Sequence, residues 1–140
     1  MIHNLVEYFL PEQEFYLDKI VYNRLPQHTG NSEYSLKCKD TVQVVLEDNG
    51  IRITVERILR FEPEEVFELA ISFGAVLKFN DKKKQDHQWK DIDLSKEFIE
   101  NGGFVIDNLM NRISLLVSQI TSSFGQTPIV LPPSLMTKNI

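Results

Sequence analysis

The chain has 140 residues, the length of one domain, and we expect a single domain over residues 1–140. Its composition of 42% hydrophobic and 25% charged residues excludes a disordered chain, and no apolar run is long enough to cross a bilayer. The net charge of -5 argues against general nucleic-acid binding, because contacts to phosphates need clustered Lys and Arg side chains.

The first predicted elements are strands. One strand is predicted over residues 15–22, and a clearer one between Tyr34 and Leu46, where most even positions are apolar and most odd positions are polar. The sequence then predicts a β-hairpin with a type I′ turn at Asn49-Gly50, since both residues tolerate a positive φ. After the turn the odd positions are apolar, so a second half-buried strand is expected there.

The pairing of this hairpin can be predicted from its side chains. A two-residue loop at Asn49-Gly50 places Leu46 opposite Ile53 and Glu47 opposite Arg52. Apolar residues then face each other on one side of the sheet and opposite charges on the other, as stable cross-strand pairs require.

A further strand completes an antiparallel meander. Pro63 cannot donate to a strand ladder, so we expect a turn there. Between Phe67 and Phe79 the odd positions are apolar, and pairing Phe61 with Phe67 places them on the same face as the strand before. With residues 15–22 the expected sheet has four antiparallel strands.

The last part of the chain is predicted to be helical. Residues 80–93 are polar and form an expected exposed connection that carries Trp89. A helix begins near Ser95 or after Gly102-Gly103 and continues to about Phe124, with Gly125 as its C-cap. The predicted fold class is therefore α+β, a four-stranded antiparallel meander with one long C-terminal helix on one face and the option of a second, short one. An extended, Pro-rich apolar stretch follows the helix.

The predicted helix is too small to cover the apolar face of the sheet. Strands about 4.8 Å apart present a face of roughly 600–800 Å², whereas a helix about 30 Å long covers on the order of 300 Å². About half of the face is therefore left uncovered by the helix, and we expect the short N-terminal segment, the Pro-rich tail, another subunit or a client to lie there. An uncovered patch of that size is usually an interaction site.

The opposite side of the helix carries small neutral side chains where Lys and Glu are usual on a solvated helix. They are Asn111, Ser114, Ser118, Thr121 and Ser122. Small side chains allow another helix to approach closely, so this side is predicted to lie in an interface between subunits; the alternative is an undercharged exposed face.

Catalytic patterns are missing from the sequence, so no enzyme and no cofactor are expected. His87 beside Asp86, Asp91 and Asp93 lacks the paired His or Cys spacing of a metal site. The basic run at residues 82–84 is flanked by acidic residues and is typical of a solvated loop. Together with a lone Cys38 and an N-terminus without a basic, signal-like region, these features predict a cytoplasmic protein without membrane insertion.

The order of elements resembles the SecB family of export chaperones. The resemblance is carried by the helix from Phe104 to Thr121, by the following Gly125, Pro128 and Leu131-Pro132-Pro133, and by the strand region from Phe61 to Phe79. It implies a four-stranded antiparallel sheet with helices on one face, and a homotetramer built as a dimer of dimers with the main helices between the sheets. It also implies ATP-independent holding of unfolded or precursor polypeptides in apolar grooves. By position it assigns client binding to Phe67, Leu69, Ile71 and Phe73, with Trp89 in the groove wall; core packing and a loop anchor are the alternatives.

Two departures argue against delivery to the export motor SecA. The sequence stops at Ile140 without the family's full second helix and C-terminal tail, and Glu68 and Ala70 preserve the motor-contacting surface only in part. A dedicated partner protein of a toxin–antitoxin system or a mobile element is therefore the alternative to an export holdase. A carrier of a small ligand, or an enzyme using the sheet, is a third class and would need a closed pocket with converging polar groups.

Overall fold

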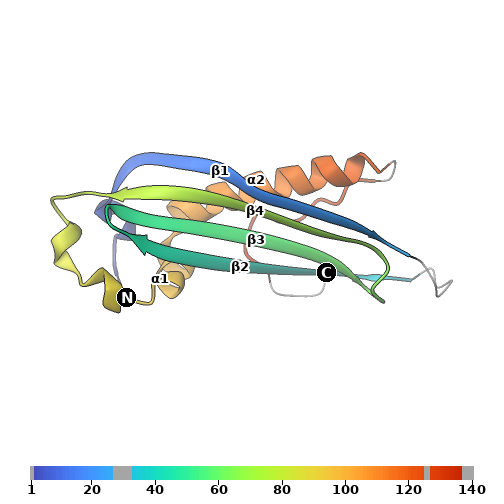
Figure 1. The fold of residues 1–140 in the computed structure, drawn as a ribbon, viewed down its shortest axis with the longest axis horizontal. Helices are drawn as coiled ribbons and strands as arrows, with labels where there is room; N and C mark the ends of the chain where they lie inside the picture. Colours follow the sequence, from blue (N-terminus) through green and yellow to red (C-terminus); the bar gives the residue numbers. More distant parts are fainter. Residues whose placement is uncertain (1, 27–32, 125–126, 137–140) are drawn as a thin grey trace.

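The computed structural model describes residues 2–26, 33–124 and 127–136. Four long strands form one antiparallel sheet in the order β1-β4-β3-β2, and two helices lie on one of its faces (Figure 1). In chain order the elements are η1 (Leu5–Tyr8), β1 (Phe9–Leu25), β2 (Ser35–Glu47), β3 (Gly50–Glu62), β4 (Val66–Phe79), η2 (Lys84–Asp86), η3 (Trp89–Asp91), α1 (Leu94–Asn101) and α2 (Gly103–Ser122). The predicted α+β fold with a four-stranded antiparallel sheet is confirmed. The meander is limited to β2, β3 and β4, because β1 pairs with β4 at the far side of the sheet from β2.

The predicted pairing of the first hairpin is wrong by two residues. The turn consists of Asp48 and Asn49, so Leu46 pairs with Ile51 instead of Ile53. Positive φ angles among the described non-glycine residues occur at Asn4 and Val66, so the turn is not type I′. Gly50 belongs to β3, where a Cβ atom would lie 1.8 Å from the carbonyl oxygen of Leu77 on β4. The glycine is therefore required by the close approach of two strands.

The shift changes partners without exchanging the faces, because it is an even number of residues. Glu47 pairs with Gly50 in the ladder, yet its carboxylate still lies 3.4 Å from the guanidinium of Arg52. The predicted register between β3 and β4 is confirmed, since Leu59 pairs with Leu69. In the same phase, the rings of Phe61 and Phe67 lie 5.1 Å apart.

Strand β1 is longer than the predicted segment of residues 15–22. It pairs with β4 and forms one edge of the sheet, with a bulge between Leu17 and Lys19. Strand β2 forms the other edge. A helix begins at each of the two predicted starts: α1 begins at Leu94, next to Ser95, and α2 begins at Gly103. The buried Gly102 separates the two helices. The proposed C-cap Gly125 lies outside the described residues.

On the two central strands the apolar face is covered by the chain itself, and two of the expected covers, the N-terminal segment and the Pro-rich tail, are found there. Ile53, Leu59, Leu69 and Leu77 are at most 1% exposed. Their cover comes from α2 and α1, from η1 and from Leu131, which is also buried. One helix covers only part of the face, and segments that are far apart in the sequence cover the rest. Within the described sheet, the apolar side chains that are most exposed belong to the edge strands β1 and β2, as described below.

The connection after β4 is less exposed than predicted. It forms η2 and η3, and the Trp89 side chain is buried at 5% exposure against the stacked rings of Phe9 and Phe79. Its indole N–H donates a hydrogen bond to the carbonyl oxygen of Lys84 at 2.7 Å. Trp89 thus anchors the connection to the core.

The chain turns back after α2. Residues 127–136, here called the return segment, contain neither helix nor strand and run behind the sheet toward β2 (Figure 1). Leu131 is buried in the core, whereas the neighbouring Val130 is 76% exposed. The return segment therefore covers the β2 side of the inner sheet face, while α2 packs over β4 and β3.

Candidate functional site

Strand β1 presents apolar side chains that its own chain leaves partly uncovered. Its register with β4 places Leu17, Ile20 and Tyr22 on the face that carries α2, opposite Phe73, Ile71 and Leu69. The three β1 side chains are nevertheless 41–49% exposed. Earlier in the strand, Arg112 of α2 lies over the ring of Phe15 at 4.5 Å and closes the gap between helix and strand. The uncovered part of the face therefore begins at Leu17 and continues to the end of β1.

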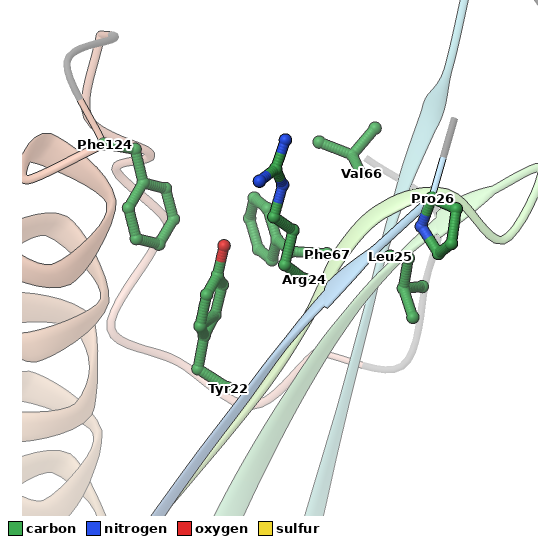
Figure 2. Close-up of a pocket in the computed structure, with 7 residues that line it drawn as sticks. All are labelled: Tyr22, Arg24, Leu25, Pro26, Val66, Phe67 and Phe124. Carbon is green, nitrogen blue, oxygen red and sulfur yellow. The ribbon is translucent and has the colours of Figure 1, made fainter.

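This uncovered stretch leads into an open groove at one end of the sheet. The groove has a volume of about 820 Å³ and is lined by Tyr22, Arg24, Leu25, Pro26, Val66, Phe67 and Phe124 (Figure 2). We call it the aromatic groove. The ring centroids of Tyr22 and Phe67 lie 5.8 Å apart, those of Tyr22 and Phe124 5.1 Å, and those of Phe67 and Phe124 5.4 Å. Three aromatic rings from β1, β4 and the end of α2 thus form one wall.

Arg24 gives the aromatic groove a positive charge. Its side chain extends between the groove residues on the α2 side and Val66 (Figure 2). Among the described residues it has no ion-pair partner. The groove therefore combines aromatic surface with a guanidinium that can donate to a carboxylate or a main-chain carbonyl.

The structure separates the five residues assigned to client binding. Phe67 lines the aromatic groove, and Phe73 is half-buried. Leu69 and Ile71, each 1% exposed, pack in the chain's own core, as the core-packing alternative expected. Trp89 is the loop anchor described above and does not line the aromatic groove. The sequence did not single out Tyr22, Arg24 and Phe124 for the groove, because the tertiary fold brings them together from three elements.

The neutral side of α2 is also divided. Asn111 and Ser122 are exposed, and between them Leu115 is 61% exposed. Thr121 is buried within the chain, since its hydroxyl accepts a hydrogen bond from the main-chain N–H of Ile129 at 2.8 Å. Ser114 and Ser118 are half-buried, and the Ser114 hydroxyl accepts from Arg57 at 3.1 Å. Two of the small neutral side chains of α2, Ser114 and Thr121, thus form hydrogen bonds with the return segment.

A buried ion pair on the inner face was not predicted. Arg57 of β3 and Asp40 of β2 pair across the sheet, and two hydrogen bonds of 2.8 Å join the guanidinium to both carboxylate oxygens. Both side chains are 0% exposed. The signal was present in the sequence, because both charges occupy apolar positions of alternating strands. The register that was two residues wrong placed them apart and so concealed the pair.

Burial and hydrogen bonding shift the pKa values of Arg57 and of the neighbouring Cys38. Burial opposes the charge on Arg57, but the hydrogen bonds to Asp40 and its negative charge outweigh burial and raise the pKa of Arg57. Burial also raises the pKa of the neighbouring Cys38 thiol to about 11, so the thiol is protonated at neutral pH. The cluster therefore places a charged Arg57 guanidinium beside a cysteine that is protonated at neutral pH.

The described residues contain no cluster of three or more His, Cys, Asp or Glu side chains suited to a metal ion. His87 instead lies 3.1 Å from the hydroxyl of Tyr8 and packs edge-on against Trp89. No helix of the described residues is long and apolar enough to cross a membrane.

A search of solved structures found a close match in fold. The Mycobacterium tuberculosis SecB-like chaperone Rv1957, solved with a ChAD peptide from the Rv1956 HigA1 antitoxin, superposes with a TM-score of 0.66. The match covers 91% of this chain and 92% of that one at 13% sequence identity. The chain has a SecB-like fold. No family model matches the SecB-like chain, and no curated protein matches it in sequence.

The outer face of the SecB-like sheet carries paired charges of both signs. Glu68 lies 3.9 Å from Arg60, and Lys19 lies 2.7 Å from Glu56. Nearer the β2 edge, Lys37 forms another ion pair at 2.8 Å. The surface around Glu68, which the resemblance relates to contact with the export motor, therefore carries basic as well as acidic side chains.

Proposed function

We propose that this protein is an ATP-independent chaperone that binds non-native polypeptide segments along β1 and in the aromatic groove. The observation that carries the proposal is the continuous apolar surface from Leu17 to Phe124, left uncovered on a SecB-like fold. The structural neighbour, which binds an antitoxin peptide, supports a polypeptide ligand. The proposed activity involves no catalytic step and no cofactor, and we place it in the cytoplasm.

The physical basis of binding is burial of apolar side chains without a fixed sequence. Each square ångström of apolar surface removed from water contributes about 25 cal/mol. Aromatic rings at the groove wall accept side chains of many shapes, and Arg24, which has no ion-pair partner among the described residues, can donate hydrogen bonds to carbonyl or carboxylate groups. Such a surface selects for exposed apolar segments, which folded proteins lack.

Suppression of aggregation tests the proposal. The protein at stoichiometric ratio, without nucleotide, should prevent light scattering by a chemically denatured client after dilution. Tyr22→Ala should weaken suppression several-fold, whereas Leu10→Ala should not. The two side chains lie on the same strand and are similarly exposed, at 41% and 39%, but only Tyr22 lines the groove. Absence of suppression by the wild-type protein at several-fold excess would refute the proposal.

A dedicated partner is favoured over a role in export. The neighbour was solved with an antitoxin peptide, and Glu68, which takes the place of a motor-contacting residue, is close to Arg60. The second candidate function is therefore an interaction with one dedicated partner, such as a component of a toxin–antitoxin system or of a mobile element. Titration of the protein with purified SecA, followed by analytical ultracentrifugation, tests this choice. A stable complex would instead support export.

We also propose that the protein is a homo-oligomer assembled through α2, as a dimer of dimers. Leu115 is 61% exposed between the exposed polar residues Asn111 and Ser122, without the charges of a solvated helix. The mass from light scattering should exceed that of the 16.3 kDa chain, and Leu115→Asp should reduce it. A wild-type monomer would contradict this assembly.

A further inference from the structure

The return segment is held through its main chain. Every hydrogen bond between it and the rest of the described chain ends on a main-chain atom of the segment. Arg57 donates to the carbonyl oxygen of Pro132 at 3.1 Å and to that of Ser134 at 2.9 Å. The Ser114 hydroxyl donates to the same carbonyl of Pro132 at 3.5 Å. These donors contact groups that every polypeptide carries.

The other hydrogen bonds follow the same rule. The N–H of Met136 donates to the Asp40 carboxylate at 2.6 Å, and the carbonyl of Met136 accepts from the N–H of Asp40 at 2.7 Å. At the other end, the N–H of Ile129 donates to Thr121, as described above. The main-chain bond from the N–H of Asp40 lies on the edge strand β2, where unpaired main-chain groups can bind an added segment.

The side chains of the return segment supply only apolar contacts. Leu131 is 5% exposed, and Ile129, Leu135 and Met136 are half-buried against the core. Val130 points away and is 76% exposed. The bound segment is therefore recognised by main-chain hydrogen bonds and by spaced apolar side chains, the features that non-native polypeptides share.

The main donor of this groove is also held by a residue outside the return segment. Asp40 holds Arg57 through two hydrogen bonds, and their side chains are 0% exposed. A guanidinium held in place loses little conformational freedom when it binds a carbonyl, which favours affinity without sequence selectivity. An ion pair is an unusual choice for a sheet interior, where apolar residues of similar size are often as stabilising. Its contacts with the return segment give the pair a binding role.

We propose that the groove formed by Asp40, Arg57, Ser114 and Thr121 is a second polypeptide-binding site, which the return segment occupies as an internal substitute for a client. Apolar client segments bind there by displacing it. The inference rests on the proposed polypeptide-binding function and assigns it a site distinct from the aromatic groove. Because the return segment competes, the apparent affinity for a client is reduced by the fraction of molecules in which the groove is filled.

A labelled peptide with the sequence of residues 127–136 tests the proposal, because it carries every contact that the groove recognises. Leu131→Ala in the full chain weakens the internal competitor and leaves the groove residues intact. The peptide should then bind at least about ten-fold more tightly than to the wild type, as judged by fluorescence anisotropy. Val130→Ala removes an exposed side chain from the same segment and should change the affinity by less than about two-fold. Equal affinity for Leu131→Ala and the wild type overturns the proposal, as does lack of binding to all three proteins.

Amide hydrogen exchange in the wild-type chain provides a test that does not depend on a folded variant. With isotope-labelled protein and excess unlabelled peptide, the amides of Ile129 and Met136 should lose protection while those of β3 and β4 keep theirs. Unchanged protection at a saturating peptide concentration overturns the proposal. If aggregation suppression by the aromatic groove persists in that case, the proposed function stands and only the second site fails.

Discussion

Replacing Arg57 by methionine removes a guanidinium whose partners are all defined by the structure. Asp40 would keep its burial and lose both 2.8 Å hydrogen bonds, and the carbonyls of Pro132 and Ser134 would lose their donor. Leaving one charge of a buried pair uncompensated costs about 3–5 kcal/mol. The two carbonyls add little, because they belong to exposed residues that water can reach. We therefore expect Arg57→Met to destabilise the protein by about 4 kcal/mol, a large part of the stability of a domain of this size.

Urea denaturation followed by the fluorescence of Trp89 measures this loss, because the ring is 5% exposed in the fold and becomes exposed on unfolding. The double variant Asp40→Leu/Arg57→Met should recover much of it and lie within about 2 kcal/mol of the wild type, since no buried charge remains. Arg57→Lys keeps the charge without the two-pronged geometry and should be intermediate. A loss below about 1 kcal/mol for Arg57→Met, or additive effects in the double variant, would refute the assignment of a coupled buried pair.

Other expected outcomes concern single residues. Because burial raises the pKa of Cys38 to about 11, its thiol should react with a thiol reagent at pH 8 about 100-fold more slowly in the folded than in the unfolded chain. A main-chain hydrogen bond lowers the pKa of Glu97 from its ordinary value of 4.5. Glu97→Gln should therefore reduce stability by at most about 1 kcal/mol above that pH, and the difference should vanish as the pH falls through the lowered folded value. Gly50→Ala should cost about 2 kcal/mol or more in a urea titration, because its Cβ would lie 1.8 Å from the main chain of Leu77. Gly103→Ala, with only a flexible side chain 3.3 Å away at the start of α2, should be neutral or stabilising.

The two proposed polypeptide sites lie on opposite sides of α2. The aromatic groove is formed by β1, β4 and the end of the helix, whereas the return segment follows the β2 side. Tyr22→Ala and Leu131→Ala therefore change different surfaces. Comparing their effects on one client separates the contribution of each site.

The parts of the fold that depend on local patterns could be predicted from the amino-acid sequence. Alternating side chains specified β2, β3 and β4, and the helical stripe predicted the buried side of α2, with Leu109 and Ile113 fully buried. The parity of each strand also fixed which residues face the core, even where the pairing was two residues wrong.

The covering of the apolar face, and the part of it that stays open, depend on contacts between segments that are distant in the sequence. The register of the first hairpin places Gly50 within β3, where it lies close to Leu77 of β4, a contact between segments distant in the sequence. That register brings Asp40 opposite Arg57, and the return segment completes their hydrogen bonds from more than seventy residues away. The aromatic groove likewise joins Tyr22, Phe67 and Phe124. Long-range packing selects among arrangements that local patterns leave equal, because a sheet shifted by two residues presents the same faces with different neighbours.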